Sequence, residues 1–256
     1  MKVFEVKNLY FSIKKKIVLN SISFALEKGK WLLIAGPNGA GKSTLIKITS
    51  GVWKKQKGTV KIWGKEIEKY TPKELACKMA TLHSVFNPLY DISVYDYVKL
   101  GIYARTGFFS FYSGKNRKDV EFAIDTTEIR PFIKKSIVEL SQGELQRVRI
   151  AKILAQNPEI MIFDEPLVHL DIKHKIWVLE LLARLRASGK TIITVIHDFS
   201  IAFPYPDNFL LLKNGETVFQ GSRENMENLV RAFEDTFEVK LTLKNGLLFP
   251  DMIRAL

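Results

Sequence analysis

Three short runs of apolar residues predict strands that are buried on both faces of a parallel sheet. They cover residues 31–35, 160–163 and 191–196, and glycine or acidic residues follow each run within two positions. Continuous apolar runs of this length are typical of strands that helices cover on both sides. Residues 171–188 carry apolar positions at helical spacing and end before Gly189, a common helix stop. The pattern therefore predicts an α/β fold.

The stretch of residues 86–157 has a different pattern. Its candidate helices cover residues 94–103, 117–127 and 145–155. No strand pattern separates these helices, which predicts a helical subdomain inserted into the sheet-forming part of the chain. Residues 1–85 and 158–256 are then expected to form the core of one domain.

Two hairpins are predicted in the last quarter of the chain. Residues 210–220 surround Asn214-Gly215, and residues 240–249 surround Asn245-Gly246. Asn-Gly between apolar stretches is a strong hairpin signal, because both residues tolerate a positive φ. No internal repeat or linker-like segment interrupts the 256 residues, so a single domain is expected.

Composition excludes several classes of protein. With 46% hydrophobic and 26% charged residues, it has the values of an ordinary globular protein with a sizeable core. Residues 1–11 alternate charged and apolar side chains, and no window approaches the roughly 18 apolar residues of a membrane span. We therefore expect a chain that is neither secreted nor membrane-spanning. Cys77 is the single cysteine, so no intrachain disulfide is possible, and we expect it to be a small packing residue.

The net charge of +12 has two interpretations. It indicates either a solvated lysine-rich surface or affinity for nucleic acid or an anionic membrane. Basic runs with interleaved aromatic residues or glycines, as in RNA-binding strands, are absent. The solvated surface is therefore favoured, and no nucleic-acid partner is expected.

A glycine-rich loop follows the first apolar run and precedes a helical stretch. Its residues are Gly36, Pro37, Asn38, Gly39, Ala40, Gly41, Lys42, Ser43 and Thr44. Glycines allow backbone N–H groups to turn toward phosphate oxygens, and the start of the helix adds its positive dipole end. Lys42 can reach the β- and γ-phosphates, and the Ser43 hydroxyl can bind Mg²⁺. The loop predicts a site for Mg-ATP.

Two carboxylates follow the second apolar run. Asp164 ends the predicted strand, where it can hold Mg²⁺ through water, and Glu165 can polarise the water that attacks the γ-phosphate. In isolation, both residues could be solvated acids at a strand end; the glycine-rich loop favours the functional interpretation.

Two further features have a structural and a functional interpretation each. Residues 140–144 read Leu-Ser-Gln-Gly-Glu before a helical run, so Ser141 and Glu144 predict a capping box. The same helix start exposes a hydroxyl and the backbone at Gly143 to an anion. His197 follows the third apolar run, where a structural role or a phosphate contact is possible.

The order of these motifs over nearly the whole chain resembles the ATP-binding cassette (ABC) ATPases. The resemblance implies a P-loop NTPase core of the RecA-like type, with a parallel sheet, an N-terminal antiparallel β subdomain and an inserted helical subdomain. It identifies residues 36–44 as Walker A, residues 140–144 as the signature and residues 160–164 as Walker B. It also makes Asp171 the D-loop aspartate and His197 the switch histidine.

The resemblance also implies partners. Two copies sandwich two ATP molecules, so that Ser141 and Gly143 of one copy contact the γ-phosphate held by Lys42 of the other. Residues 94–114 and the late hairpin are more specifically similar to the ATPase subunits of iron–siderophore, haem and cobalamin importers. These subunits lie on the cytoplasmic face of the membrane and work with a transmembrane permease and, indirectly, an extracytoplasmic substrate-binding protein.

Several positions depart from the family pattern. Ser84, preceded by His83, stands where the Q-loop glutamine is usual, which puts coupling to the permease in doubt. Ile13 falls where an aromatic residue usually stacks on adenine; losing that stacking costs roughly 0.5 to 1.5 kcal/mol. Gln142 replaces the second signature glycine, and His169 replaces a small D-loop residue.

The leading hypothesis is thus an importer ATPase subunit, with the aromatic-rich residues 86–112 as docking surface for the permease or simply as core. Two alternatives are an ABC-type ATPase acting on nucleic acid, the ribosome or cluster assembly, and an unrelated P-loop kinase. The kinase predicts no role for Ser141 or Glu165. The transported substrate stays open, because in this family a binding protein and the permease recognise it.

Overall fold

The computed structural model describes residues 1–84, 86, 91–106, 114–244 and 246–251. Two compact units divide the chain: residues 1–67 with 179–256, and residues 68–178. The division falls inside a long helix, α6 (Ile172–Ala187). The boundaries of the helical subdomain at residues 86 and 157 stay a prediction.

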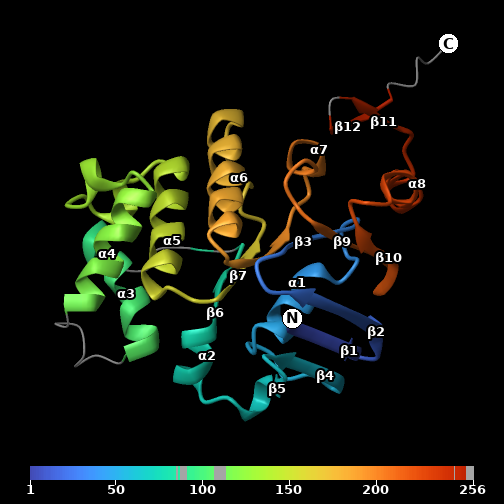
Figure 1. The fold of residues 1–256 in the computed structure, drawn as a ribbon, viewed down its shortest axis with the longest axis horizontal. Coiled ribbons are helices and arrows are strands. Elements are labelled where there is room, and N and C mark those ends of the chain that lie inside the picture. Colours follow the sequence, from blue (N-terminus) through green and yellow to red (C-terminus); the bar gives the residue numbers. More distant parts are fainter. Residues whose placement is uncertain (85, 87–90, 107–113, 245, 252–256) are drawn as a thin grey trace. The chain divides into compact units, whose positions relative to one another are not determined.

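The first unit contains an antiparallel sheet built from the N-terminal part of the chain (Figure 1). Its order is β2-β1-β4-β5, with β1 (Lys2–Ile13), β2 (Lys16–Glu27), β4 (Lys57–Ile62) and β5 (Lys65–Glu66). Val6 on β1 lies opposite Phe24 and Val60, and all three side chains are buried. The predicted N-terminal antiparallel subdomain is confirmed.

Mostly parallel strands form a second sheet of this unit. β3 (Trp31–Ala35) lies between β8 (Thr191–Val195) and β9 (Asn208–Lys213), and β10 (Glu216–Ser222) pairs antiparallel with β9. Every residue of β3 and β8 is buried. This burial is the reason that their sequences are continuous apolar runs, and it confirms the prediction of strands covered on both faces.

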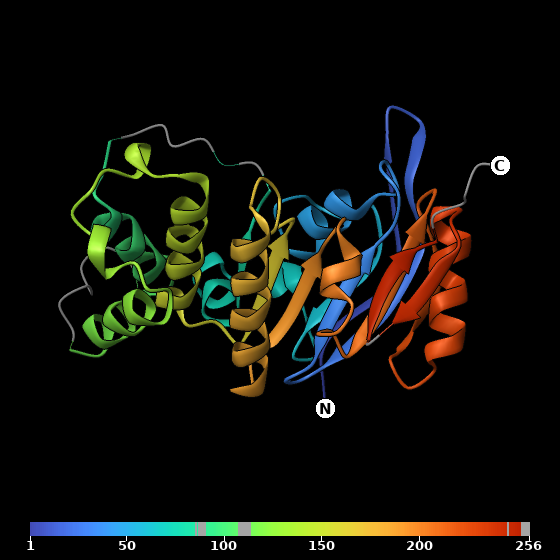
Figure 2. The ribbon, with the colours of Figure 1, turned by 90° about the horizontal axis from the view of Figure 1, so that it is seen from above.

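Helices and a second hairpin complete the first unit. The helices are α1 (Lys42–Thr49), α7 (Phe199–Ala202) and α8 (Met226–Phe237). α8 lies along β9 and β10 (Figure 2), where Phe233 packs against Phe199, Phe203 and Phe209 at ring distances of 4.8 to 6.1 Å. β11 (Leu241–Lys244) and β12 (Leu247–Pro250) form the predicted late hairpin, although Asn245 of its turn lies outside the described residues.

The second unit combines two parallel strands with helices. β6 (Met79–Leu82) pairs with β7 (Ile160–Asp164), and the helices are α2 (Pro72–Lys78), α3 (Val94–Thr106), α4 (Gly114–Thr126) and α5 (Gln142–Gln156). Among the described residues, 3₁₀ turns cover Arg130–Phe132 and Ile137–Glu139, and a further one, Ile67–Lys69, spans the boundary between the two units. A Cβ at Gly101 would collide with the Lys152 carbonyl, so this glycine lets α3 approach α5 closely. The predicted helices are confirmed.

The burial of Cys77 was predicted wrongly. The residue lies in α2, as its sequence context indicated, but it is exposed. α2 buries none of its side chains fully, so helical spacing did not reveal which face would pack. None of the helices in the described ranges combines the length and apolar character that a membrane crossing requires.

Candidate nucleotide site

Steric contacts determine the backbone of the glycine-rich loop between β3 and α1. Gly36 has φ +152°, and a Cβ there would collide with the Leu212 carbonyl. Gly41 has φ +98°, and a Cβ would lie 2.7 Å from the Val18 carbonyl oxygen. Only glycine combines these φ values with such close backbone contacts. Glycine at positions 36 and 41 is therefore required for the loop to keep this backbone.

Lys42 begins α1 and is almost fully buried, with 5% of its surface exposed. Its ammonium donates to the carbonyls of Gly36 at 2.7 Å and Pro37 at 2.9 Å. The N-cap residue Gly41 has no side chain to accept from the first turn of α1. Positive charge and the uncapped helix start thus lie together at the loop, as the sequence predicted.

His197 leaves the parallel sheet at the same edge as this loop. Ile34 and Val195 lie opposite each other on β3 and β8, and Ile196 N–H donates to the Ile34 carbonyl at 3.4 Å. His197 follows directly and is exposed. Its predicted position at a strand end is confirmed; its contact with phosphate stays a prediction.

Asp164 and Ser84 lie together in the second unit. Asp164 ends β7 and is 1% exposed, while Ser84 follows β6, the parallel neighbour of β7. The Ser84 hydroxyl donates to Asp164 Oδ2 at 3.5 Å. The residue at the Q-loop position therefore contacts the predicted Mg²⁺-binding carboxylate directly, although its side chain is shorter than glutamine.

Glu165 has an unusual backbone. Its φ is +56°, and that of His169 is +62°, a left-handed conformation that costs a non-glycine residue about 1 to 2 kcal/mol. The Gln146 side chain donates to the carbonyl of Pro166 at 2.7 Å and so holds the turn after Glu165. Strained backbone at a candidate catalytic carboxylate is consistent with a functional role, because such outliers cluster at active sites.

The signature residues form the start of α5. Ser141 is the N-cap: its Oγ accepts from Glu144 N–H at 3.3 Å, and its own N–H donates to Glu144 Oε2 at 2.9 Å. The N–H and hydroxyl of Ser141, in that order, lower the pKa of Glu144 because both donate to the carboxylate. The predicted capping box is confirmed, and Ser141 stays exposed.

His174 is a residue that the sequence interpretation missed. A Cβ on Gly143 would lie 2.7 Å from both Cδ2 and Nε2 of His174, so the imidazole lies directly against the glycine. Asp171 Oδ1 lies 2.8 Å from the His174 ring Nδ1 and also accepts from the His174 N–H at 2.8 Å. His174 therefore joins the D-loop aspartate to the signature glycine within one unit. Its place one helical turn after Asp171 was the available signal.

Gln146 and Arg149 on α5 were also missed. Arg149 donates to Gln146 Oε1 at 2.9 Å and, through Nη2, to the His83 carbonyl. Burial lowers the pKa of Arg149. Because Gln146 also holds Pro166, the helix that starts at the signature contacts the segments beside both Ser84 and Glu165. Ser84, Gln142, Arg149 and Glu165 border a cavity of about 430 Å³.

Ile13 lies at the end of β1 and is 42% exposed. Its neighbour Phe11 stacks on Trp53 with the ring centroids 5.6 Å apart, and the Lys47 ammonium lies 4.7 Å from the Trp53 ring. Phe11 thus has an aromatic partner within the first unit, whereas Ile13 presents an aliphatic surface to solvent. How adenine is held stays a prediction.

The predicted site residues fall on both units. The loop and His197 belong to the first unit, while Asp164, Glu165, the signature and Asp171 belong to the second. Within each unit the geometry is as described above. That the two sets act as one site stays a prediction.

Comparison with known proteins gives a family. Residues 19–168 match the model of the family described as "ABC transporter". The chain is 37% identical over 227 residues to the petrobactin import ATP-binding protein of Bacillus subtilis, covering 87% of this chain and 88% of that protein. It is 37% identical to the manganese transport system ATP-binding protein of Listeria innocua, covering 86% and 90%. An uncharacterized ABC transporter ATP-binding protein of Bacillus subtilis is 40% identical over 77% of this chain, but the match spans 45% of that protein.

Solved structures agree with the fold. An ATP-binding cassette in its ADP conformation has a TM-score of 0.81 at 24% identity, covering 93% of this chain and 98% of that one. A dimeric bacterial ABC transporter cassette has a TM-score of 0.75 at 28% identity, covering 86% and 98%. The α/β fold with its parallel sheet, antiparallel β subdomain and P-loop is thus that of the cassettes. The chain belongs to the ABC transporter family, as one of its ATP-binding, ATP-hydrolysing cassettes.

Proposed function

We propose that this chain is the ATPase subunit of an importer for metal chelates or metal ions, located at the cytoplasmic face of the membrane and coupled to a separate permease. The observation that carries the proposal is the loop of residues 36–44, whose backbone only glycine at positions 36 and 41 permits and which encloses the Lys42 ammonium. Family membership supports the same activity.

The residues present suit Mg-ATP. Lys42 and the uncapped start of α1 provide positive potential for the phosphates. The Ser43 hydroxyl and the Asp164 carboxylate are the oxygen ligands that Mg²⁺ prefers, and Asp164 is buried with the Ser84 hydroxyl beside it. A bound Mg²⁺ would neutralise part of the negative charge of the phosphates.

Glu165 and His197 are proposed to act on hydrolysis. Glu165 accepts a proton from, or orients, the attacking water, and its position is restrained because Gln146 holds the following residue. His197 is proposed to contact the γ-phosphate from the strand end beside the loop. Both groups act only after the phosphates are bound.

A homodimer is proposed for the ATP-bound state. Ser141 and Gly143 of one copy then contact the γ-phosphate on Lys42 of the other, and Asp171 lies in the dimer contact. Around Asp171, Val168, Ile172 and Ile176 are 43%, 60% and 42% exposed. Exposed apolar side chains grouped in this way mark interaction surfaces. A solved cassette of the same fold is dimeric.

The cargo is proposed to be an iron–siderophore, haem or cobalamin, delivered by an extracytoplasmic binding protein. A relative named for petrobactin import supports an iron–siderophore as cargo, while a relative named for manganese transport keeps metal ions within the class of proposed cargo. Uptake of a radiolabelled ferric siderophore and of manganese by vesicles that contain the chain with a co-expressed permease would separate the two.

Permease docking is proposed at residues 86–112. Residues 85, 87–90 and 107–113 lie outside the described residues. In the described part, Val98 and Ile102 are buried, whereas Leu100 is 39% exposed. α3 thus contributes core residues on one face and exposed residues on another, so this stretch can both pack the unit and offer a docking surface to a permease.

Glu165→Gln tests the proposed mechanism. We expect the variant to lose hydrolysis and to elute as an ATP-bound dimer in size exclusion, because it keeps the phosphate contacts but cannot accept a proton. Glu180→Gln, which changes an exposed carboxylate on α6, is the matched control and should behave as wild type. A Glu165→Gln chain that stayed monomeric at saturating ATP and still turned over would refute the mechanism.

The alternative is an ABC-type ATPase that acts on nucleic acid, and the net charge of +12 is the observation that favours it. Salt-dependent binding of RNA or DNA near physiological ionic strength would support it. Co-purification with the permease, and ATPase activity that the permease changes, would support the importer.

A further inference from the structure

A second cavity lies in the first unit, at the sheet edge opposite the glycine-rich loop. It has a volume of about 390 Å³, within the range of small-molecule sites. Lys30 precedes β3, Arg186 lies near the end of α6, Asp207 precedes β9 and Arg223 follows β10; all four border the cavity. The six residue-to-residue steps from Lys30 to Gly36 span roughly 20 Å of strand, so this cavity is distinct from the ATP loop.

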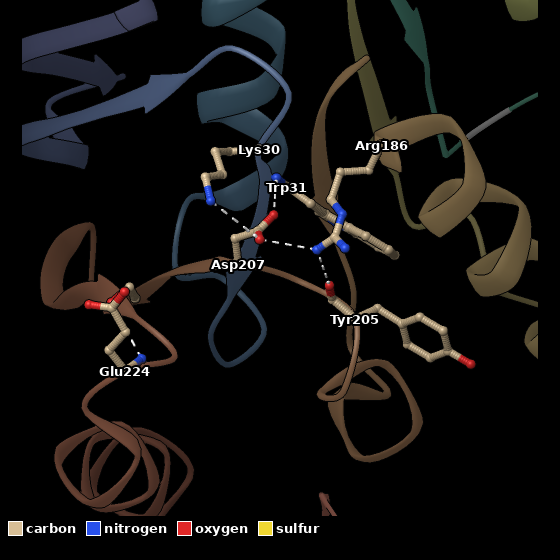
Figure 3. Close-up of polar contacts among 7 residues, drawn as sticks. Lys30, Trp31, Arg186, Tyr205, Asp207 and Glu224 are labelled. Atoms are coloured by element: carbon tan, nitrogen blue, oxygen red, sulfur yellow. Dashed lines mark hydrogen bonds and ion pairs between the residues drawn. The ribbon is translucent and has the colours of Figure 1, made fainter. Parts of the chain in front are cut away.

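Asp207 already uses both of its carboxylate oxygens. Oδ2 accepts from Trp31 N–H at 2.9 Å, and Oδ1 accepts from Arg186 Nη1 at 3.0 Å. The Lys30 ammonium is 3.8 Å from the same Oδ1. Figure 3 shows Lys30 and Arg186 approaching Asp207 from two sides. One carboxylate therefore neutralises two cations only in part.

Arg223 adds a third cation that no carboxylate pairs. Among the described residues it forms no ion pair, and its Nη2 donates to the Phe203 carbonyl. Its Nε is buried and has no hydrogen-bond partner in the described part of the chain. Burial lowers the pKa of Arg223, and Asp207 opposes that change. Arg223 thus borders the cavity without an oxyanion ligand among the described residues, although its Nε itself is closed to solvent.

Glu224 does not supply that ligand. It also borders the cavity but is exposed, and its N–H donates to the Ser222 hydroxyl at 3.4 Å. Figure 3 shows its carboxylate apart from the group of Lys30, Arg186 and Asp207. The cavity thus retains excess positive charge beside a donor that lacks an acceptor.

We propose that this cavity binds a small molecule carrying a phosphate or carboxylate group, with Arg223 as its main ligand and Lys30 and Arg186 as supporting cations. A guanidinium presents paired N–H donors that match both oxyanions. Asp207 keeps Lys30 and Arg186 in place and connects them to the main chain of Trp31 at the start of β3. The proposal is independent of ATP hydrolysis and of the cargo.

Equilibrium dialysis with radiolabelled inorganic phosphate, and separately with citrate, tests the proposal. The chain carries Lys42→Ala, so that the ATP loop does not contribute. We expect one bound anion per chain, at least tenfold weaker binding in Arg223→Gln, and about threefold weaker binding in Lys30→Gln, whose side chain is 47% exposed and tolerates exchange. Arg231→Gln, which changes an exposed arginine paired with Glu227 on α8, is the control and should bind as the parent.

Binding to lipid vesicles distinguishes a lipid headgroup from a free anion as the natural ligand. If a lipid headgroup is the natural ligand, vesicles with anionic phospholipid should retain the parent chain but not the Arg223→Gln chain, and neutral vesicles should retain neither. Circular dichroism verifies that each variant folds. Equal anion binding by the parent and both site variants would overturn the proposal, as would the absence of any binding of phosphate, citrate or anionic vesicles by a folded parent.

Discussion

The contact between Gly143 and His174 allows a quantitative test of how the signature is held. In Gly143→Ala the new Cβ would lie 2.7 Å from Cδ2 and Nε2 and 3.1 Å from Cε1 of the imidazole. The ring must move, and it then loses its 2.8 Å contact with Asp171 Oδ1. Overpacking of this kind costs about 1 to 3 kcal/mol.

The substitution also has a stabilising effect, which must be subtracted from the cost of the clash. Gly143 is the second residue of α5, and replacing a helical glycine by alanine stabilises by about 0.5 to 1 kcal/mol. We therefore expect Gly143→Ala to lower the free energy of unfolding by about 1 kcal/mol in urea denaturation. Gly114→Ala is the matched control: this glycine begins α4, and its Cβ would meet nothing within 4 Å, so it should stabilise.

A double-mutant cycle decides whether His174 is the cause. In the His174→Ala background the clash is gone, and Gly143→Ala should become neutral or stabilising. If Gly143→Ala destabilised the protein equally with and without the His174 ring, the contact would not hold the signature and the argument would fail. ATP-dependent dimerisation of the same variants reports whether the contact also positions Ser141.

Three more predictions concern the capping box of α5 and the glycine-rich loop. Ser141→Ala removes the N-cap of α5 and should lower stability by about 1 kcal/mol, measured by urea denaturation. The folded-state pKa of Glu144 lies below its ordinary value of 4.5, so the stability that its carboxylate contributes is present above that pH and is lost as pH falls through the folded pKa. Glu144→Gln should therefore reduce the loss of stability seen in unfolding curves between pH 6 and pH 3. An unchanged pH dependence would assign the loss to other carboxylates. Gly36→Ala would place a Cβ against the Leu212 carbonyl, so nucleotide binding by fluorescent ATP should be abolished; wild-type affinity would mean that the loop can rearrange.

Local patterns determined a large part of this protein. Burial on both faces makes β3 and β8 continuous apolar runs, which are visible without a structure. The capping box at Ser141 and Glu144 depends on neighbours within a few positions, so its geometry was also predictable. The glycine-rich loop was visible as a motif, although contacts with the distant Leu212 and Val18 restrict its backbone. Cys77 marks the limit: helical spacing predicted α2 correctly but not which side chains it would bury.

Tertiary structure alone decided the contacts between distant segments. His174 lies against Gly143, and Arg149 donates to the carbonyl of His83, across 31 and 66 positions of sequence. Lys30, Arg186 and Arg223 border one cavity although nearly two hundred residues separate the first from the last. Such contacts depend on how strands and helices pack and not on local spacing. The sequence alone therefore determined the family and the ATP loop, and only the folded chain brought His174 to the signature and three cations to a second site.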